Sequence, residues 1–508
     1  MEILFQDNGE WRADCALVLL PEGGAVRDAA PFLWESFPWI GLSPALRDCS
    51  GRKAELSLLY GHPELPLPRV LVAGLGKPAD FTLNAFRSAL AGAVAACRAR
   101  GFTALALPVE TLPVAALKLP LETLIRESVC AALCGLYRLD RYRSEPPEEF
   151  SPQMASLALC FSARVPDAAR QAAREGRSEA EGVLLARDLA NGPANIVTPA
   201  ALAEEAGRLA ARCGFTSTVL GPREIRALGM GAFWAVARGS GEKPRLIILE
   251  HCPEGREGED PLIFVGKGIT FDSGGISLKP AEGMQRMKSD MVGAAAVLGL
   301  FQVIGSCGDA GNLPRIIGII PAAENMPDGG ATRPGDIVTA LSGKTVEIVN
   351  TDAEGRLILC DALAYALRRW KPRLLVDIAT LTGACVVALG REAGGLFTGD
   401  PALRDCFLES AEASGDLLWP LPLWKEYEAD LKSDSADMVN SASREGGAVL
   451  AALFLRRHLE PGVPWVHLDV AGSGHVRKAT PLNPVPGGSG VGVRLFYAVA
   501  RRFALKAS

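Results

Sequence analysis

The chain has 508 residues, of which 48% are hydrophobic and 22% are charged. This apolar content is enough to bury a large core, which excludes disorder for most of the chain. The formal net charge of −5, from 53 Lys and Arg against 58 Asp and Glu, gives no electrostatic reason to expect nucleic acid as the main partner.

The first part of the chain alternates apolar runs with Ala-rich helical runs. Strands are predicted at 16–20, 70–72, 104–107 and 155–161. The segment 82–97 predicts a helix, and the polar, Pro-rich segment 143–152 predicts a loop. This alternation is typical of an α/β domain, which we expect to be the smaller of two and to cover residues 1–170.

A charged helical stretch at 168–189 follows, and we expect the connecting helix between the two domains at 171–190. The larger second domain is predicted over 191–508, where strands and helices alternate again. Strands are predicted at 246–250, 262–266, 316–320, 346–349, 374–378 and 465–470, and helices at 291–304, 356–368, 448–458 and 491–503. This order predicts a central, mostly parallel sheet covered by helices, with ligands at the carboxyl ends of its strands.

The N-terminal residues contain no basic segment followed by an apolar one, so we expect no secretory signal. The most apolar segment, 291–307, is interrupted by Gln302 and is better explained as a buried helix than as a membrane span. The twelve Cys are scattered without a CxxC pair, which favours reduced thiols. Together these features predict a cytoplasmic protein with no membrane partner.

Charged residues collect in five segments that we expect close to strand ends. These segments are Phe264–Lys279, Met287–Asp290, Glu324–Asp336, Asn350–Arg356 and Asp377–Ala384. Asp352 and Glu354 are two residues apart, so in extended backbone they point the same way. With Asp272 and Asp290 they make four carboxylates, which suit Mg²⁺, Mn²⁺ or Zn²⁺ and are enough to bridge two metal ions.

A simpler alternative exists for each carboxylate taken alone. Asp352 and Asp290 precede predicted helices and fit the role of helix caps, and Glu354 fits the positive end of a helix dipole. This alternative is weaker for all four carboxylates together with two nearby lysines.

The octapeptide NTDAEGRL at 350–357 resembles the signature of the leucyl aminopeptidases, the M17 cytosol aminopeptidase family. The resemblance continues through VGKGITFDSGGISLKP at 265–280, MKSDMVGAAAV at 287–297, DIATLTGA at 377–384, RDLANGPANIVTP at 187–199 and WVHLDVAG at 465–472. It covers about residues 187–495, and the first part of the chain resembles the family only weakly, through Gly74–Lys77.

The resemblance implies two divalent metal ions per subunit, Mn²⁺ or Zn²⁺, with Mg²⁺ and Co²⁺ as alternatives. One ion would be held by Lys267, Asp272, Asp290 and Glu354, and the other by Asp272, Asp352, Glu354 and the main-chain carbonyl of Asp352. A lysine that binds a metal must be neutral, which requires a pKa depressed by the cations. The alternative for Lys267 is a charged partner of the carboxylates.

The resemblance also implies catalytic roles for two basic residues. Lys279 would stabilise the oxyanion, and Arg356 would hold a bicarbonate ion that acts as general base, beside backbone amides near Gly355 and Leu381. The alternative for Arg356 is a salt bridge to a carboxylate. The pocket for the N-terminal side chain would draw on Met287, Thr380 and Thr382.

The implied activity is hydrolysis of the N-terminal residue, leucine and other mainly apolar residues, from peptides, by a water that bridges the two metals. The family also implies a homohexamer. Two alternatives are a regulatory or DNA-binding protein on a peptidase scaffold and a catalytically inactive structural subunit. All seven expected catalytic and metal positions are filled, which argues against the inactive subunit.

Overall fold

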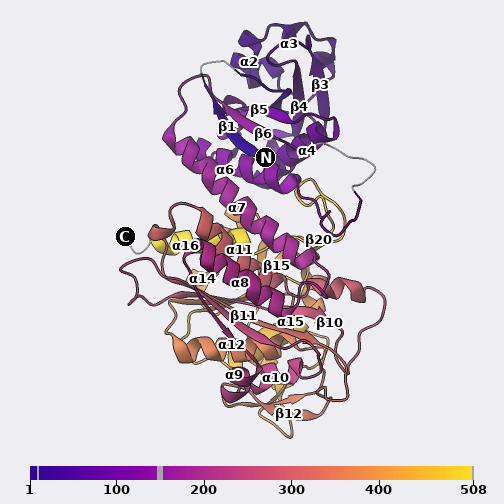
Figure 1. The fold of residues 1–508 in the computed structure, drawn as a ribbon. Coiled ribbons are helices and arrows are strands. Elements are labelled where there is room, and N and C mark those ends of the chain that lie inside the picture. Colours follow the sequence, from indigo (N-terminus) through magenta and orange to yellow (C-terminus); the bar gives the residue numbers. More distant parts are fainter. Residues whose placement is uncertain (8–10, 146–152, 506–508) are drawn as a thin grey trace. The chain divides into compact units, whose positions relative to one another are not determined.

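The computed structural model describes residues 1–7, 11–145 and 153–505, and it divides into two compact units (Figure 1). The first unit is Met1–Ala180 with Lys478–Val485, and the second is Glu181–Arg477 with Pro486–Ser508. The division falls inside helix α7 (Asp167–Asn191). Lys478–Val485 lies within the range 191–508 that the sequence predicts for the second domain, and it is grouped with the first unit because Leu482 packs against that unit's core.

The first unit is built on a six-stranded sheet. Its strand order is β1 (Glu2–Gln6), β6 (Ser156–Cys160), β5 (Ala104–Pro108), β2 (Cys15–Pro21), β4 (Arg69–Gly76) and β3 (Leu56–Tyr60). All neighbours are parallel except β3 and β4. Helices α4 (Leu83–Ala99) and α6 (Leu121–Gly135) bury their apolar sides in a core on one face. A second core, with Leu33 and Ile40 from short helices, covers the other face, so this unit has the predicted α/β class.

The second unit contains a nine-stranded sheet. Its order is β16 (Leu418–Pro420), β15 (Gly394–Phe397), β18 (Trp465–Asp469), β14 (Leu374–Ala379), β9 (Leu262–Gly266), β11 (Ile316–Asn325), β8 (Arg245–His251) and β7 (Thr216–Leu220), with β10 (Gly268–Asp272) also paired to β11. The central strands β18, β14, β9 and β11 are parallel, and antiparallel pairs occur toward both edges. The prediction of a mostly parallel sheet is confirmed.

Helices cover both faces of this sheet (Figure 1). Ile263 and Val265 of β9 belong to the core formed with α10 (Gly231–Ala237), α12 (Gly355–Arg369) and α15 (Gly447–Arg457). Phe264 points to the opposite face, where its ring centroid lies 4.6 Å from that of Phe496. That face is covered by α8 (Pro199–Cys213), α11 (Val292–Ser306), α14 (Pro401–Ser414) and α16 (Val493–Leu505). Burial on both faces explains why β9 is a continuous apolar run.

The helical segment Met284–Ser306 is the one stretch in the described chain that is long and apolar enough to cross a membrane. Its most apolar window is 83% buried inside the protein, which matches the buried helix expected at 291–307. All twelve Cys have free thiols, and only Cys252 is exposed.

Two glycines allow the N-terminal end of α11 to approach the sheet. A Cβ added at Gly266, the last residue of β9, would lie 2.2 Å from the carbonyl oxygen of Gly293 in α11. A Cβ added at Gly293 would lie 2.2 Å from the carbonyl oxygen of Ile378 in β14. Because these contacts are to backbone, a side chain at either position must separate the helix from the strands.

We expect Gly266→Ala to lower the free energy of unfolding by about 3 kcal/mol, because overpacking against rigid backbone costs energy of this order. Thermal unfolding monitored by circular dichroism measures the effect. The matched control is Gly207→Ala in α8, where an added Cβ meets nothing within 4 Å. The control should raise stability by up to about 1 kcal/mol, because alanine is the better helix former. Equal midpoints for the two variants would contradict the close approach at Gly266.

Candidate functional site

The predicted site residues meet beyond the carboxyl ends of β9, β10 and β14. Lys267 follows β9, Asp272 is the last residue of β10, and Thr380 follows β14. The parallel pairing of β9 with β14 brings the first and third of these segments side by side. All three residues line a cavity of about 1160 Å³, which also includes Lys279, Met287, Asp290, Asp352, Glu354, Arg356, Leu381 and Thr382.

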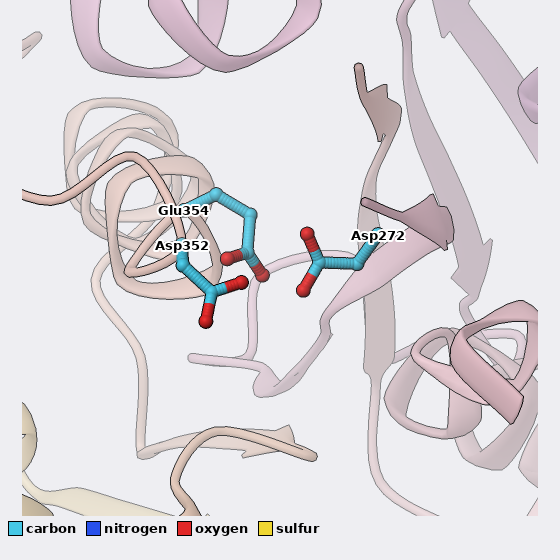
Figure 2. A group of neighbouring side chains, drawn as sticks. All are labelled: Asp272, Asp352 and Glu354. Atoms are coloured by element: carbon cyan, nitrogen blue, oxygen red, sulfur yellow. The ribbon is translucent and has the colours of Figure 1, made fainter. Parts of the chain in front are cut away.

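Three of the four predicted carboxylates converge (Figure 2). Asp272, Asp352 and Glu354 each offer an oxygen, and these oxygens lie within 4.8 Å of one another. Asp352 and Glu354 come from the segment before α12, and Asp272 faces them from β10. Asp272 and Glu354 are only 3% and 2% exposed. Buried like charges at this separation repel each other, so the cluster requires positive charge.

The backbone that presents Asp352 and Glu354 differs from the prediction. Strand β13 (Thr345–Ile348) ends before them, Asp352 lies in a turn, and Glu354 has helical dihedral angles of −78° and −35°. The expected extended geometry is therefore wrong, and the two carboxylates converge because a turn leads directly into α12. Neither α11 nor α12 has a side-chain cap hydrogen bond, so helix capping does not explain Asp290 or Asp352.

Lys267 is a buried link between two of the carboxylates. Its Nζ lies 2.8 Å from Oδ2 of Asp290 and 2.7 Å from Oε1 of Glu354, and it donates to the carbonyl oxygen of Thr380 at 3.0 Å. Burial lowers the pKa of Lys267, but Asp290 and Glu354 outweigh burial and leave that pKa raised. In this arrangement Lys267 is the charged partner of the carboxylates, and it must lose its proton before it can bind a metal ion.

Gly355 provides the space for Lys267. A Cβ added at Gly355 would lie 2.7 Å from Nζ of Lys267 and 2.8 Å from its Cε. Because Lys267 is held by three polar partners, its side chain cannot move away without breaking them. The predicted site residue Gly355 therefore lies against the lysine at the first turn of α12.

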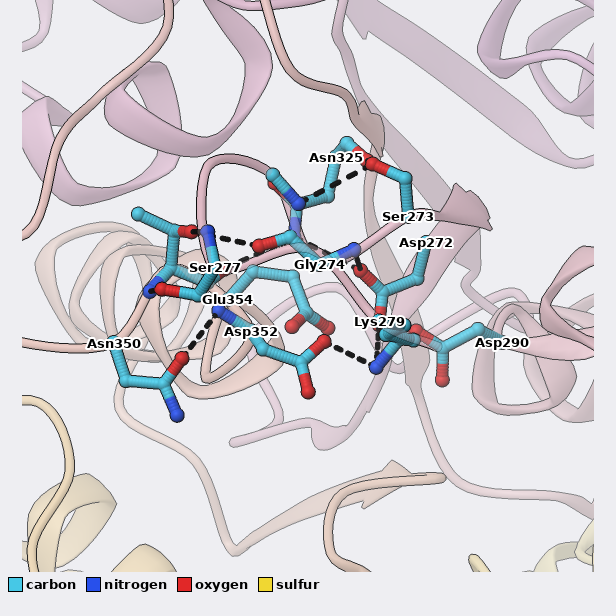
Figure 3. Close-up of polar contacts among 12 residues, drawn as sticks. Asp272, Ser273, Gly274, Ser277, Lys279, Asp290, Asn325, Asn350, Asp352 and Glu354 are labelled. Atoms are coloured by element: carbon cyan, nitrogen blue, oxygen red, sulfur yellow. Dashed lines mark hydrogen bonds and ion pairs between the residues drawn. The ribbon is translucent and has the colours of Figure 1, made fainter. Parts of the chain in front are cut away.

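Lys279 links the other two carboxylates (Figure 3). Its Nζ lies 2.7 Å from Oδ2 of Asp272 and forms a second ion pair with Asp352. Burial lowers the pKa of Lys279, but Asp272 and the other nearby carboxylates outweigh it and leave that pKa raised. Its side chain remains 21% exposed, so Lys279 faces the cavity while Lys267 lies beneath the cluster.

The surroundings of these carboxylates disfavour their charged form. Burial, and then the neighbouring carboxylates, raises the pKa values of Asp272 and Asp352. Burial also raises the pKa of Asp290 well above its usual value, in spite of Lys267. A divalent cation would relieve this repulsion, and oxygen-rich donor sets of this kind suit hard cations. The residues present therefore fit a metal centre.

Neighbouring polar groups fix the orientation of Asp272. Its Oδ1 accepts from the backbone N–H of Gly274 and from Nδ2 of Asn325, both at 2.9 Å (Figure 3). Asn325 lies at the end of β11 and also donates to the carbonyl oxygen of Thr351 at 3.0 Å. This asparagine connects the strand that carries Asp272 to the turn that carries Asp352.

Arg356 is a buried cation whose Nε is an unused, buried donor among the described residues. Its Nη1 donates to the carbonyl oxygen of Asn440 at 2.8 Å, and its Nε has no hydrogen-bond partner among the described residues. It forms no salt bridge to a carboxylate in that part of the chain. Burial lowers the pKa of Arg356 to about 10, which leaves it charged at neutral pH.

The segment after β14 is anchored by Asp469, which the sequence analysis did not identify as part of the site. Oδ2 of Asp469 accepts from Oγ1 of Thr382 at 2.6 Å, and Oδ1 accepts from the backbone N–H of Leu381 at 3.2 Å. The hydroxyl of Thr380 donates to Oδ1 of Asp290 at 2.6 Å. The Leu381 amide therefore already has a partner, while Thr380 is tied directly to the cluster.

Asn440 was also missed, because it lies 84 residues beyond Arg356 and belongs to no motif. It is fully buried, its Nδ2 donates to the carbonyl oxygen of Asn350 at 2.7 Å, and its Oδ1 accepts from the N–H of Val349 at 2.9 Å. Oδ1 of Asn350 in turn accepts from the N–H of Asp352. Asn440 thus holds the turn that presents Asp352.

We expect Asn440→Leu to weaken metal binding about 10- to 100-fold, which is the usual effect of losing a group that orients a ligand. The physical reason is that the backbone of Val349 and Asn350 loses its buried partners. Titration of the chelator-treated protein with Mn²⁺ measures the affinity. Asn312→Leu, at an exposed position in the same unit, is the control. Unchanged affinity in a folded Asn440→Leu variant would show that the turn needs no such support.

Two protein-family models match most of the chain. Residues 184–497 match the cytosol aminopeptidase family, catalytic domain, and residues 23–146 match the N-terminal domain of that family. The chain is 51% identical to a probable cytosol aminopeptidase of Nitratidesulfovibrio vulgaris and 49% identical to one of Desulfovibrio desulfuricans. The alignments cover 98% of this chain and of the first relative, and 99% of this chain and of the second.

Two solved structures resemble the whole chain. The bottromycin maturation enzyme BotP in complex with Mn has a TM-score of 0.83 and 36% identity, with 97% of this chain and 100% of that chain covered. A mutant of tomato leucine aminopeptidase has a TM-score of 0.82 and 31% identity, with 99% of this chain and 97% of that chain covered. These similarities extend over both units.

Proposed function

The chain belongs to the cytosol aminopeptidase family and is an aminopeptidase, and we propose that it works with two divalent metal ions held by the clustered carboxylates. The observation that carries this proposal is the convergence of Asp272, Asp352 and Glu354 within 4.8 Å in a buried site. Two lysines supply positive charge to this cluster, which supports the proposal that its carboxylates are paired with cations.

In the proposed centre, Lys267, Asp272, Asp290 and Glu354 would hold one ion, and Asp272, Asp352, Glu354 and the carbonyl oxygen of Asp352 would hold the other. Asp272 and Glu354 would belong to both sets, which is supported by their burial and by their closeness to Asp352. We propose Mn²⁺ or Zn²⁺, with Mg²⁺ and Co²⁺ as alternatives. The structural relative BotP was solved with Mn, which supports the first choice.

When bound, two such ions polarise the scissile carbonyl group and lower the pKa of the attacking water. Lys279 faces the cavity from beside Asp272, where its charge stabilises the oxyanion that develops on the carbonyl oxygen. The unused Nε of Arg356 and its buried charge suit a small anion, and we propose bicarbonate there as the general base.

The proposed substrates are peptides with a free α-amino group and leucine or another mainly apolar residue in first position. Met287, Thr380 and Thr382 line the cavity beside the cluster and would contact that side chain. We also propose a homohexamer and a cytoplasmic location. The relatives' names, which describe cytosol aminopeptidases, support that location.

The test is hydrolysis of leucine p-nitroanilide by chelator-treated protein before and after addition of Mn²⁺ or Zn²⁺. N-acetyl-leucine p-nitroanilide is the control substrate, because acetylation removes only the free amine. Metal-restored cleavage of the free-amine substrate alone is expected. Cleavage of both substrates, or activity that survives chelation, would contradict the proposed mechanism. A folded, metal-loaded protein that cleaves no peptide would point to the inactive-subunit or DNA-binding alternative.

A further inference from the structure

Four arginines that the proposed mechanism does not use line the same cavity as the carboxylate cluster. Arg444 is one of them, and the charges of the other three all act on His475. Arg286 directly precedes Met287 in the short helix Met284–Ser289, Arg391 follows α13 (Gly383–Leu389), and Arg477 follows β19 (His475–Val476). We refer to Arg286, Arg391 and Arg477 as the cationic rim. Three separate chain segments therefore bring positive charge to one opening.

The members of the cationic rim lie close enough to affect one another. Nη1 of Arg391 donates to the carbonyl oxygen of His475 at 3.2 Å. Burial, followed by the charges of Arg477 and Arg286, lowers the pKa of Arg391. Burial and then the three rim arginines, together with Lys288, also lower the pKa of His475. The rim is thus a concentration of like charge around His475.

The positive charge of the rim is not neutralised within the described part of the chain. None of the three arginines there forms an ion pair with an acidic side chain, whereas Arg208, Arg315 and Arg456 elsewhere in the unit each do. Apart from the four carboxylates of the candidate centre, Glu282 is the one acidic residue that lines the cavity. The chain as a whole carries a net charge of −5, so this cluster is a local feature.

Guanidinium groups in a concave site have a specific preference among ligands. Their planar donors match a carboxylate, often through two hydrogen bonds, and a cleft lined by one sign of charge attracts the opposite sign. The cavity receives peptides in the proposed function. A peptide offers carboxylates from two sources, an acidic side chain and its own C-terminus.

We propose that the cationic rim binds a carboxylate of the peptide substrate, so that the enzyme favours peptides with a negative charge near the scissile bond. This inference rests on the proposed aminopeptidase function. Arg286 and Met287, the proposed contact of the first side chain, both line the cavity, so an acidic first residue, in addition to the mainly apolar ones, is one source of this charge to test. In a dipeptide, the C-terminal carboxylate lies one residue beyond the scissile bond and offers the same charge.

The experiment compares kcat/KM for two matched pairs of substrates with Mn²⁺-loaded enzyme. Glutamyl and glutaminyl 7-amido-4-methylcoumarin test the side chain, and Leu-Gly and Leu-Gly amide test the C-terminus. For at least one pair, kcat/KM for the charged substrate should exceed kcat/KM for its neutral match by about 10-fold at low salt. This ratio of the two kcat/KM values should fall as salt is added. Ratios near 1 in both pairs would overturn the proposal.

The double variant Arg286→Gln with Arg477→Gln carries the test, because both side chains are exposed and their loss leaves the Arg391 contact in place. The preference for the charged substrate should fall about 10-fold in this variant. Arg208→Gln is the matched control, because the Arg208 side chain is exposed on α8 and is paired with Glu205. This variant should keep the kcat/KM ratio of the native enzyme. A ratio that the double variant does not change would also overturn the proposal.

A second measurement separates failure of this inference from failure of the proposed function. Leu-Gly and Leu-Gly amide are titrated by calorimetry into chelator-treated protein, where no catalysis is needed. Tighter binding of the free acid, lost in the double variant, supports the rim even if no substrate is cleaved. Equal affinities of the two peptides, with active metal-loaded enzyme, would overturn the rim and leave the aminopeptidase function intact.

Discussion

The Glu354→Ala variant is expected to lose both metal ions and about 10⁴-fold in kcat/KM. Glu354 is 2% exposed, and its carboxylate lies between Lys267 and the oxygens of Asp272 and Asp352. The proposed centre places it in both ligand sets, so its removal opens both. The ions supply several kcal/mol of transition-state stabilisation, which corresponds to a loss of this size. Metal content per chain and initial rates with leucine p-nitroanilide measure the two effects.

The control for this variant is Glu347→Ala on β13, seven residues earlier, where the carboxylate accepts a hydrogen bond from Ser433 outside the cluster. It should retain both ions. The folding of Glu354→Ala must be checked by circular dichroism, because this variant leaves Lys267 with one carboxylate partner fewer. Two ions still bound to a folded Glu354→Ala variant would show that Glu354 does not bridge them.

The Lys279→Ala variant is expected to lose about 10²- to 10³-fold in kcat while it keeps its metal ions. Lys279 faces the cavity and belongs to neither proposed ligand set, so in the proposed mechanism its charge would act on the substrate. Removal of one donor to a developing oxyanion usually costs this much. Parallel measurement of kcat, KM and metal content distinguishes a catalytic from a structural role.

Lys371→Ala provides the comparison, because that side chain is 88% exposed and does not line the cavity. It should leave kcat unchanged. Loss of metal from Lys279→Ala would mean that the ion pairs with Asp272 and Asp352 organise the ligands. An unchanged kcat would remove Lys279 from the mechanism.

Several central strands of the fold follow from the sequence, whereas the short buried strands β10 and β15 and the exposed edge strand β7 do not. Strand β9 is a continuous apolar run because helices cover both faces, and β14 is apolar apart from the buried Asp377. Each prediction lies within a residue of the observed strand. Strand β7 was not predicted, because it is an exposed edge strand of mixed polarity whose pairing with β8 is antiparallel. Its position is determined by a distant partner that local periodicity does not reveal.

The candidate site was also predicted only in part from the sequence. The carboxylates and lysines were identified from charged residues beside apolar runs and from the family resemblance. Their convergence requires the order β14, β9 and β11 in the sheet, which spacing along the chain does not contain. Asn440 and Asp469 were missed because each supports a site segment that is distant in sequence. The local backbone at Glu354 was misjudged because a turn, rather than a longer strand, joins β13 to α12.

The central claim is that one carboxylate cluster holds two catalytic ions. A crystal soaked in Mn²⁺ and measured for anomalous scattering tests it directly. Two anomalous peaks are predicted within ligand distance of both Asp272 and Glu354, with Lys267 and Asp290 at one peak and Asp352 at the other. Peaks elsewhere, or no peak at this cluster in a protein that cleaves leucine p-nitroanilide, would contradict the account.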